Sequence, residues 1–258
     1  MAVDRRGILQ QVADGELTPE EAERLLRESE NGPVPEPETD IRSIKISAGV
    51  GGIEIVGDSS VSQAEVEGPH RAEVDGDTLV IHGDWEQGGE GFSFRVGRHG
   101  RRRSFVHVGE ENRKLARLRV RANPSLDVDA ELDAGVMSIR GMRGRIRARV
   151  AAGPVTLEEF TGTLDVAVNA GAVRANGKLT QGESRIRSDA GAVRVELDAS
   201  SSVQVFAQAA LGKVVVPNSS DPAQRRFVTG AKREATIGGG DATLRVETAM
   251  GSVHITTR

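Results

Sequence analysis

The sequence predicts a mainly β protein, a β-solenoid of two-strand coils with about 18–20 residues per coil, preceded by a small α-helical hairpin. The phrase Asp133-Ala134-Gly135 returns in related form at Gly153, Gly171 and Gly191, so the glycines lie 18, 18 and 20 residues apart by subtraction. Alternating apolar residues follow each glycine. A short fixed period of this kind is typical of stacked coils that bury one another's apolar faces.

Two strands are expected in each coil. The second and fourth residues after each glycine are apolar, which predicts a strand with one buried face: Met137 and Ile139, Val155 and Leu157, Val173 and Ala175, Val193 and Val195. A second glycine, at Gly144, Gly162 or Gly182, then precedes another alternating run. Glycine suits such corners because it reaches positive φ without steric cost.

Two other solenoid types fit less well. A left-handed hexapeptide solenoid needs an apolar residue at every sixth position, but steps of six from Val155 reach Thr161 and Ala167. Pectinase-like β-helices have longer coils with a third strand. In the two-strand register, Arg147, Asp165 and Arg185 are expected in one outward column, where alternating charge would stabilise the stack modestly or simply form a solvated face.

The solenoid domain is expected to span residues 41–258, because weaker forms of the repeat follow Gly51, Gly212 and Gly251. Less regular strand candidates are predicted to form antiparallel hairpins at one end; they are residues 64–67, 71–74, 78–82 and 115–121. The open end of a parallel stack exposes unpaired backbone groups, so something must cover it or use it for assembly.

A different domain is expected at residues 1–30. Apolar stripes on two short helices, with Thr18-Pro19-Glu20-Glu21 as the start of the second, predict a helical hairpin. So small a hairpin buries too little apolar surface to be stable alone, so it needs a partner. The candidate oligomerisation residues are Ile8, Leu9, Val12, Leu25 and Leu26. The linker, residues 31–40, holds three prolines that favour an extended spacer.

Composition places the chain among globular proteins, with 258 residues, 37% hydrophobic and 28% charged residues, and a formal net charge of −4. The absence of cysteine excludes disulfides, and the five histidines share no ligand spacing, so neither a metal site nor a cofactor is expected. No apolar run is long enough for a signal peptide or a membrane span. We therefore expect a cytoplasmic protein, with peripheral membrane association as an open alternative.

Charge is distributed unevenly along the chain. Residues 1–40 have a net charge of −7, from four basic and eleven acidic residues, whereas residues 95–121 have a net charge of +8, from ten basic and two acidic residues. The candidate anion-binding residues are Arg95, Arg98, Arg101, Arg102 and Arg103. They would bind an anionic membrane surface or nucleic acid. The alternative is that the segment is a solubilising insertion, either exposed to solvent or folded against the acidic hairpin.

A carbohydrate-active enzyme is the alternative from another class, because a solenoid face can present paired carboxylates to a sugar. The available acids are Glu158 and Glu159, and the alternating set Asp127, Asp129, Glu131 and Asp133. General acid catalysis requires one desolvated carboxyl beside another that stays ionised. Nothing in the sequence indicates such a pair, so no catalytic residue is assigned and the chain is predicted not to be an enzyme.

The hairpin sequence from Gly15 to Ala22, the Asp133-Ala134-Gly135 repeats and the closing run from Met250 to Ile255 resemble the bacterial putative-adhesin family. Its members, of the LiaX and YvlB type, are also called toastrack-domain proteins. The resemblance implies a non-enzymatic role in envelope-stress sensing, surface interaction or scaffolding, and supplies no catalytic residues. We therefore expect a self-associating scaffold or sensor in which the helical hairpin mediates assembly into a homo-oligomer, with a further protein partner as an additional expectation.

Overall fold

The structure, a computed structural model, describes residues 40–83, 92–96, 105–106, 117–217 and 228–258. The chain divides into two units, residues 1–39 and 40–258, and every described residue belongs to the second. The expected helical hairpin, residues 1–30, lies outside the described residues, as does the expected linker apart from Asp40. The described part is mainly β and contains no helix.

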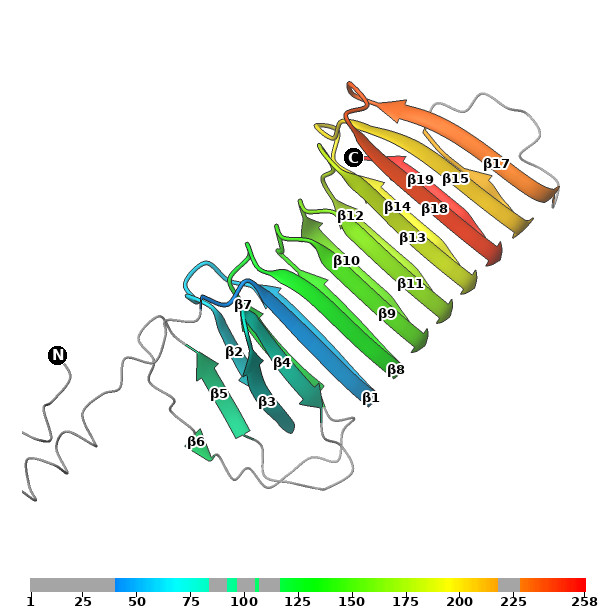
Figure 1. The fold of residues 1–258 in the computed structure, drawn as a ribbon. Coiled ribbons are helices and arrows are strands. Elements are labelled where there is room, and N and C mark those ends of the chain that lie inside the picture. Colours follow the sequence, from blue (N-terminus) through cyan, green and yellow to red (C-terminus); the bar gives the residue numbers. More distant parts are fainter. Residues whose placement is uncertain (1–39, 84–91, 97–104, 107–116, 218–227) are drawn as a thin grey trace, which may run out of the picture. The chain divides into compact units, whose positions relative to one another are not determined.

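Two sheets face each other across a shared core (Figure 1). The long strands β1 and β8 each pass through a corner and contribute to both sheets. In spatial order, the first sheet contains β3 (His70–Asp75), β4 (Thr78–Gly83), β1 (Ser43–Gly57), β8 (Asp127–Arg140), β9 (Ile146–Ala152), β11 (Leu164–Ala170), β13 (Glu183–Ala190), β18 (Ala242–Met250), β15 (Val203–Gly212) and β17 (Val228–Ile237). The second contains β5 (Phe92–Val96), β2 (Ala64–Glu67), β7 (Arg117–Ala122), β1, β8, β10 (Val155–Phe160), β12 (Val173–Gly177), β14 (Val193–Leu197), β19 (Val253–Thr257) and β16 (Val214–Val215). A further strand, β6 (Phe105–Val106), pairs with β5.

The central coils confirm the predicted two-strand repeat. Each coil contributes one strand to each sheet, and neighbouring coils pair in parallel. Asp165 is the register partner of both Arg147 and Arg185, so the predicted outward column is confirmed.

Coil order in space differs from coil order along the chain. The last coil, β18 and β19, lies between β13 and β14 on one side and β15 and β16 on the other. The first coil, β1, likewise lies inside β4 and β7. Both the first and the last coil therefore have a parallel neighbour on each side, which the repeat itself does not indicate.

Antiparallel strands lie at both ends of the stack, although the sequence predicts them at one. At one end β3 pairs with β4 and β2 pairs with β7; at the other β17 pairs with β15. The candidates 78–82 and 115–121, expected in antiparallel hairpins, form β4 and most of β7, which also pair in parallel with β1. The first sheet thus ends in antiparallel strands on both sides, whereas the second sheet ends at one side in β16, which pairs in parallel with β19.

The core is narrow and filled mainly by aliphatic side chains that alternate with outward residues along each strand. Among the side chains that the structure describes, Phe160 is the largest that is fully buried. Its register partner on the neighbouring strand β12 is Gly177, where a Cβ would lie 2.7 Å from the Phe160 ring. The ring thus has room because the inward position beside it, in the next coil, has no side chain, and large rings are rare in this chain, with an aromatic content of 3%.

Close backbone contact at the corners explains the repeated glycine. A Cβ on Gly171 would lie 2.0 Å from the carbonyl oxygen of Gly153, and one on Gly191 would lie 1.9 Å from that of Gly171. Gly171 also has a φ of 154°, which residues with a Cβ rarely adopt. Glycine is therefore required at these corners both by space and by conformation.

Two buried hydroxyls interrupt the apolar core of the first sheet. Ser188 and Thr248 are register partners on β13 and β18, and both side chains are buried. Neither Ser188 Oγ nor Thr248 Oγ1 has a hydrogen-bond partner among the described residues. An unpaired buried hydroxyl costs folding free energy.

We predict that Gly171→Ala lowers the free energy of unfolding by at least about 3 kcal/mol, because the new methyl group meets backbone that cannot move aside. Gly76→Ala is the matched control. Gly76 has a φ of 60° but no atom within 4 Å of the position that a Cβ would take, so only the conformational cost of about 1 kcal/mol is expected. Urea unfolding measures both, and equal losses would contradict the steric explanation.

Thr248→Val should raise the free energy of unfolding by about 1 kcal/mol, since it removes an unpaired hydroxyl while conserving shape. The same urea titration measures the change. A lower stability for this variant would show that the hydroxyl has a partner.

Candidate functional site

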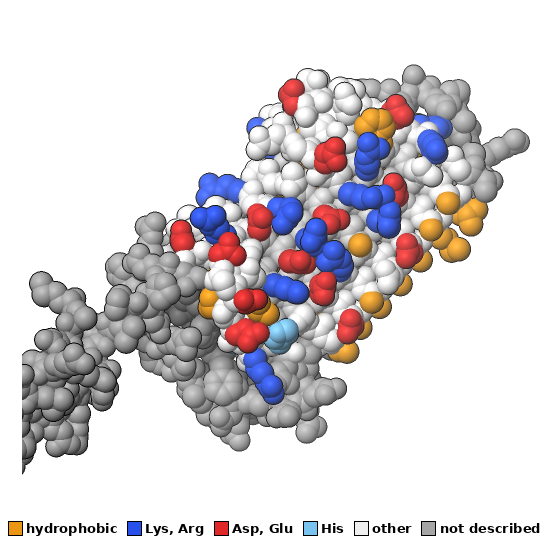
Figure 2. Space-filling model, in the orientation of Figure 1, with side chains coloured by type: hydrophobic (Ala, Val, Ile, Leu, Met, Phe, Trp, Pro, Cys, Tyr) orange, Lys and Arg blue, Asp and Glu red, His pale blue; other side chains and the backbone are white. Residues whose placement is uncertain are grey.

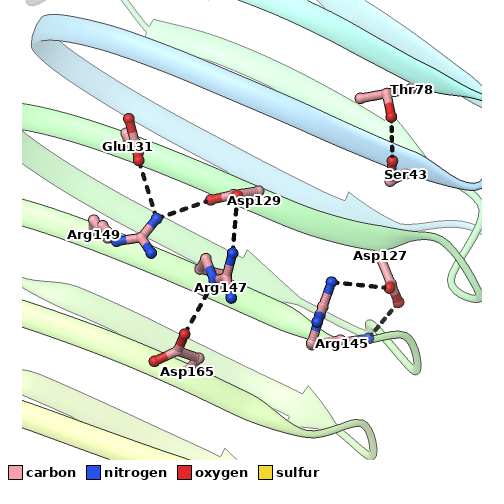
Figure 3. A network of polar contacts seen from close by, with 9 residues as sticks. All are labelled: Ser43, Thr78, Asp127, Asp129, Glu131, Arg145, Arg147, Arg149 and Asp165. Atoms are coloured by element: carbon pink, nitrogen blue, oxygen red, sulfur yellow. Dashed lines mark hydrogen bonds and ion pairs between the residues drawn. The ribbon is translucent and has the colours of Figure 1, made fainter. Parts of the chain in front are cut away.

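Outward side chains of the first sheet form a ladder of alternating charge (Figures 2 and 3). Arg147 on β9 lies between Asp129 on β8, at 3.7 Å, and Asp165 on β11, at 3.0 Å. Arg149 binds Asp129 and Glu131 at 3.5 and 3.0 Å. These contacts follow from the parallel register, which places equivalent residues of successive coils side by side.

The inserted coil completes this ladder. Glu247 on β18 accepts hydrogen bonds from Arg185 at 2.9 Å and from Arg187 at 3.4 Å. The Arg185 hydrogen bond, and to a smaller extent Arg187, lower the pKa of Glu247. Sequence reasoning missed this cluster because it could not place β18 beside β13.

On the second sheet, part of the basic segment 95–121 is already paired. Arg117 and Arg119 on β7 contact Glu54 at 3.4 and 3.2 Å. Arg121 contacts Asp58 at 2.6 Å and Glu65 at 2.9 Å. These three cations serve the packing of β7 against β1 and β2.

Asp58 is the most strongly perturbed of the described carboxyls on this face. Hydrogen bonds from the Ser60 hydroxyl, from Arg121 and from the Ser60 backbone N–H lower its pKa from the ordinary 3.8 to about 2. The carboxylate accepts the Ser60 hydroxyl at 2.6 Å and the Ser60 N–H at 2.8 Å. Asp58 is therefore held ionised in a turn after β1.

Four of the six acids considered for catalysis, Glu158, Asp127, Asp129 and Glu131, form ion pairs in the same way. Glu158 forms an ion pair with Arg140, and the neighbouring Glu159 is exposed. Of the alternating set, Asp127 contacts Arg145 at 3.7 Å, while Asp129 and Glu131 belong to the ladder. The described carboxyls with a resolved shift have a lowered pKa, whereas a general acid needs a raised one.

Most of the site residues predicted from the sequence belong to segments that the structure does not describe. The candidate oligomerisation residues, Ile8, Leu9, Val12, Leu25 and Leu26, lie outside the described residues, as do Arg98, Arg101, Arg102 and Arg103. The backbone of Arg95 lies in β5, opposite Glu65 of β2. Assembly through the hairpin and anion binding by the arginine-rich segment both stay predictions.

Sequence reasoning also missed an exposed apolar edge. The side chains directly before the corner glycines at which the first-sheet strands end form one register column, and we call this column, together with Val136, the apolar edge. The column consists of Val50, Ala134, Ala152, Ala170, Ala190, Met250 and Leu211, in spatial order. Figure 2 shows a row of apolar side chains along the margin where the parallel strands of the first sheet end in Figure 1.

The large members of this edge are strongly exposed. Met250 is 60% exposed, Val50 58%, Leu211 51% and Val136, which follows Gly135, 47%. Large apolar side chains gathered in one line mark an interaction surface more often than the same residues scattered singly. The signal in the sequence is the apolar residue before each glycine of the Gly135 type, which the repeat alone does not mark as an exposed surface.

Neither a metal cluster nor a membrane-spanning helix occurs in the described ranges. Among the residues that the structure describes, no three His, Cys, Asp or Glu side chains gather so as to hold a metal ion. Within the same ranges, no helix has the length and apolar character needed to cross a membrane.

Comparisons with known proteins give one family and two similar structures. The family model described as Toastrack DUF4097 matches residues 37–256. A putative cell adhesion protein from Clostridium sporogenes is similar in structure, with a TM-score of 0.44 and 14% identity over 86% of this chain and 95% of the other. A putative adhesin from Bacteroides fragilis has a TM-score of 0.20 and 10% identity over 84% and 94% of the two chains. Among curated proteins, the comparison found no match.

The lowered pKa of Asp58 allows a test of its contacts with Ser60 and Arg121. Since folding lowers this pKa from 3.8 to about 2, the ionised carboxylate stabilises the fold above pH 4, and this contribution is lost as the pH falls from about 4 to 2. Asp58→Asn should therefore weaken the pH dependence of the unfolding free energy in that window.

Ser60→Ala is the companion variant, because the Ser60 hydroxyl is the largest cause of the shift. It should move the acid-induced loss of stability toward higher pH. Urea unfolding at a series of pH values measures both variants. An Asp58→Asn protein with the wild-type pH profile would contradict the assignment.

Proposed function

The chain belongs to the Toastrack DUF4097 family, and from this premise we propose that it is a non-enzymatic scaffold or sensor linked to the bacterial cell envelope or to surface interactions. One observation carries the proposal: outward arginines and carboxylates of the two sheets bind each other across coils. The faces therefore stabilise a stack and present no desolvated acid pair suited to catalysis among the described residues.

Self-association through the N-terminal segment is the finer part of the proposal. The outermost strands of the first sheet carry exposed charge, with Arg71, Glu73 and Asp75 on β3, and Lys232 and Glu234 on β17. Charged edge strands oppose pairing between sheets of two molecules. This supports assigning assembly to residues 1–39, with Ile8, Leu9, Val12, Leu25 and Leu26 as the contact residues, rather than to these two edges of the first sheet.

The test compares the absolute mass in solution of the full chain with that of a chain lacking residues 1–39, by light scattering after size separation. We expect a discrete oligomer for the full chain and a monomer for the shortened one. Leu25→Ser with Leu26→Ser should have the same effect as the deletion, because these substitutions remove the apolar stripe alone.

Val74→Ser is the matched control, since Val74 is an exposed apolar residue of β3 outside the proposed contact. It should leave the oligomer intact. An unchanged mass after the deletion, or a monomeric full chain, would overturn the assembly role.

A further inference from the structure

The apolar edge is too narrow to hold a protein partner by itself. Seven corners spaced by about 4.8 Å give a length of about 29 Å, and the two sheets that meet there are about 10 Å apart. The footprint is thus about 300 Å², against about 800 Å² per partner in a stable protein interface. A convex edge facing a second convex edge would bury even less.

Two arginines beside this edge are left without a counter-ion among the described residues. Arg174 and Arg194 are register partners on the outward side of β12 and β14, and His254 of β19 continues their column. Both arginines are exposed and have no ion pair, side-chain hydrogen bond or ring contact with a described residue.

Every other strand arginine whose side chain the structure describes is engaged. Arg245 lies 5.1 Å from the centre of the Phe206 ring, Arg71 and Arg233 have polar partners, and the rest form ion pairs. Like charges directly opposite each other destabilise a sheet, so the pair of Arg174 and Arg194 does not stabilise the stack of coils.

Charge differs between the two flanks of the edge. Arg174 and Arg194 lie two residues beyond Ala172 and Ala192 on the second-sheet flank, with Glu196 as the next outward residue of β14. Asp133 and Asp189 lie on the first-sheet flank. A negatively charged surface at the edge would therefore be attracted by the arginines of the second-sheet flank and repelled by the aspartates of the first-sheet flank.

We propose that the apolar edge docks on a bilayer that contains anionic phospholipid. Val50, Val136, Leu211 and Met250 enter the interfacial region, and Arg174 and Arg194 bind headgroup phosphates. A fluid lipid surface closes around a convex edge, so a footprint of about 300 Å² suffices there although it fails for a rigid protein partner. Guanidinium groups suit phosphate oxygens because they donate two hydrogen bonds at once. This proposal goes beyond the scaffold role and does not depend on self-association.

The test is flotation of the full chain with vesicles of phosphatidylcholine, with and without phosphatidylglycerol. We expect binding to the anionic vesicles that falls with added salt. Arg174→Ser with Arg194→Ser should weaken it about tenfold or more, since each basic residue near an anionic surface contributes measurably to affinity. Leu211→Ser with Met250→Ser should weaken it at least as much, and Asp189→Asn should strengthen it.

Matched controls exist in the same chain. Arg143→Ser removes an exposed arginine from a corner after β8, away from the apolar edge, and Val74→Ser removes an exposed apolar residue from β3; both should bind as wild type. Circular dichroism confirms that each variant is folded. Because the edge residues are exposed, unfolding is not expected.

Three outcomes would overturn the proposal. One is the absence of binding to phosphatidylglycerol vesicles by the wild-type chain. Another is wild-type binding by both edge variants. The third is binding lost only in a chain with Arg101, Arg102 and Arg103 changed to Ser, which would assign the interaction to the arginine-rich segment. None of these readouts reports on solution mass, so the scaffold proposal is judged separately.

Discussion

The close approach of backbone at the corners is the constraint on which the rest of the structure depends. Gly191 lies over Gly171 and Gly171 over Gly153 with no room for a Cβ, so each corner fixes the height of the next coil. Strands that leave such a corner start in register on both sheets. The aliphatic core then fills by alternation, because inward positions of successive coils coincide.

Register also determines which surface side chains find a partner within the stack. On the faces, arginine and carboxylate side chains from neighbouring coils meet, as Arg147 does with Asp129 and Asp165. Each exposed pair contributes little alone, and networks contribute more. At the edge the same register aligns apolar side chains that have no counterpart in the stack. In the described part of the molecule, most charged side chains of the two faces are therefore paired, whereas the apolar side chains of one edge and the neighbouring Arg174 and Arg194 have no partner in the stack.

Sequence periodicity predicted the coils, their corners and the column of Arg147, Asp165 and Arg185, because these follow from spacing alone. It could not predict that β18 lies between β13 and β15. Every coil carries the same glycine and apolar signals, so nothing local distinguishes chain neighbours from spatial neighbours. The pairing of Arg185 with Glu247 was hidden for this reason. The oligomerisation candidates, Leu25 and Leu26 among them, lie outside the described residues, so the structure does not test them.

The continuity of the apolar edge from Ala190 through Met250 to Leu211 depends on this inserted coil. Engineered cysteines test it directly, since the chain has none of its own. Glu183→Cys with Thr243→Cys should form a disulfide under mild oxidation, because these residues are register partners. Glu183→Cys with Gln204→Cys should not, since two coil spacings, about 9.6 Å, exceed disulfide reach. The reverse result would show coils stacked in chain order and would contradict the fold on which the edge depends.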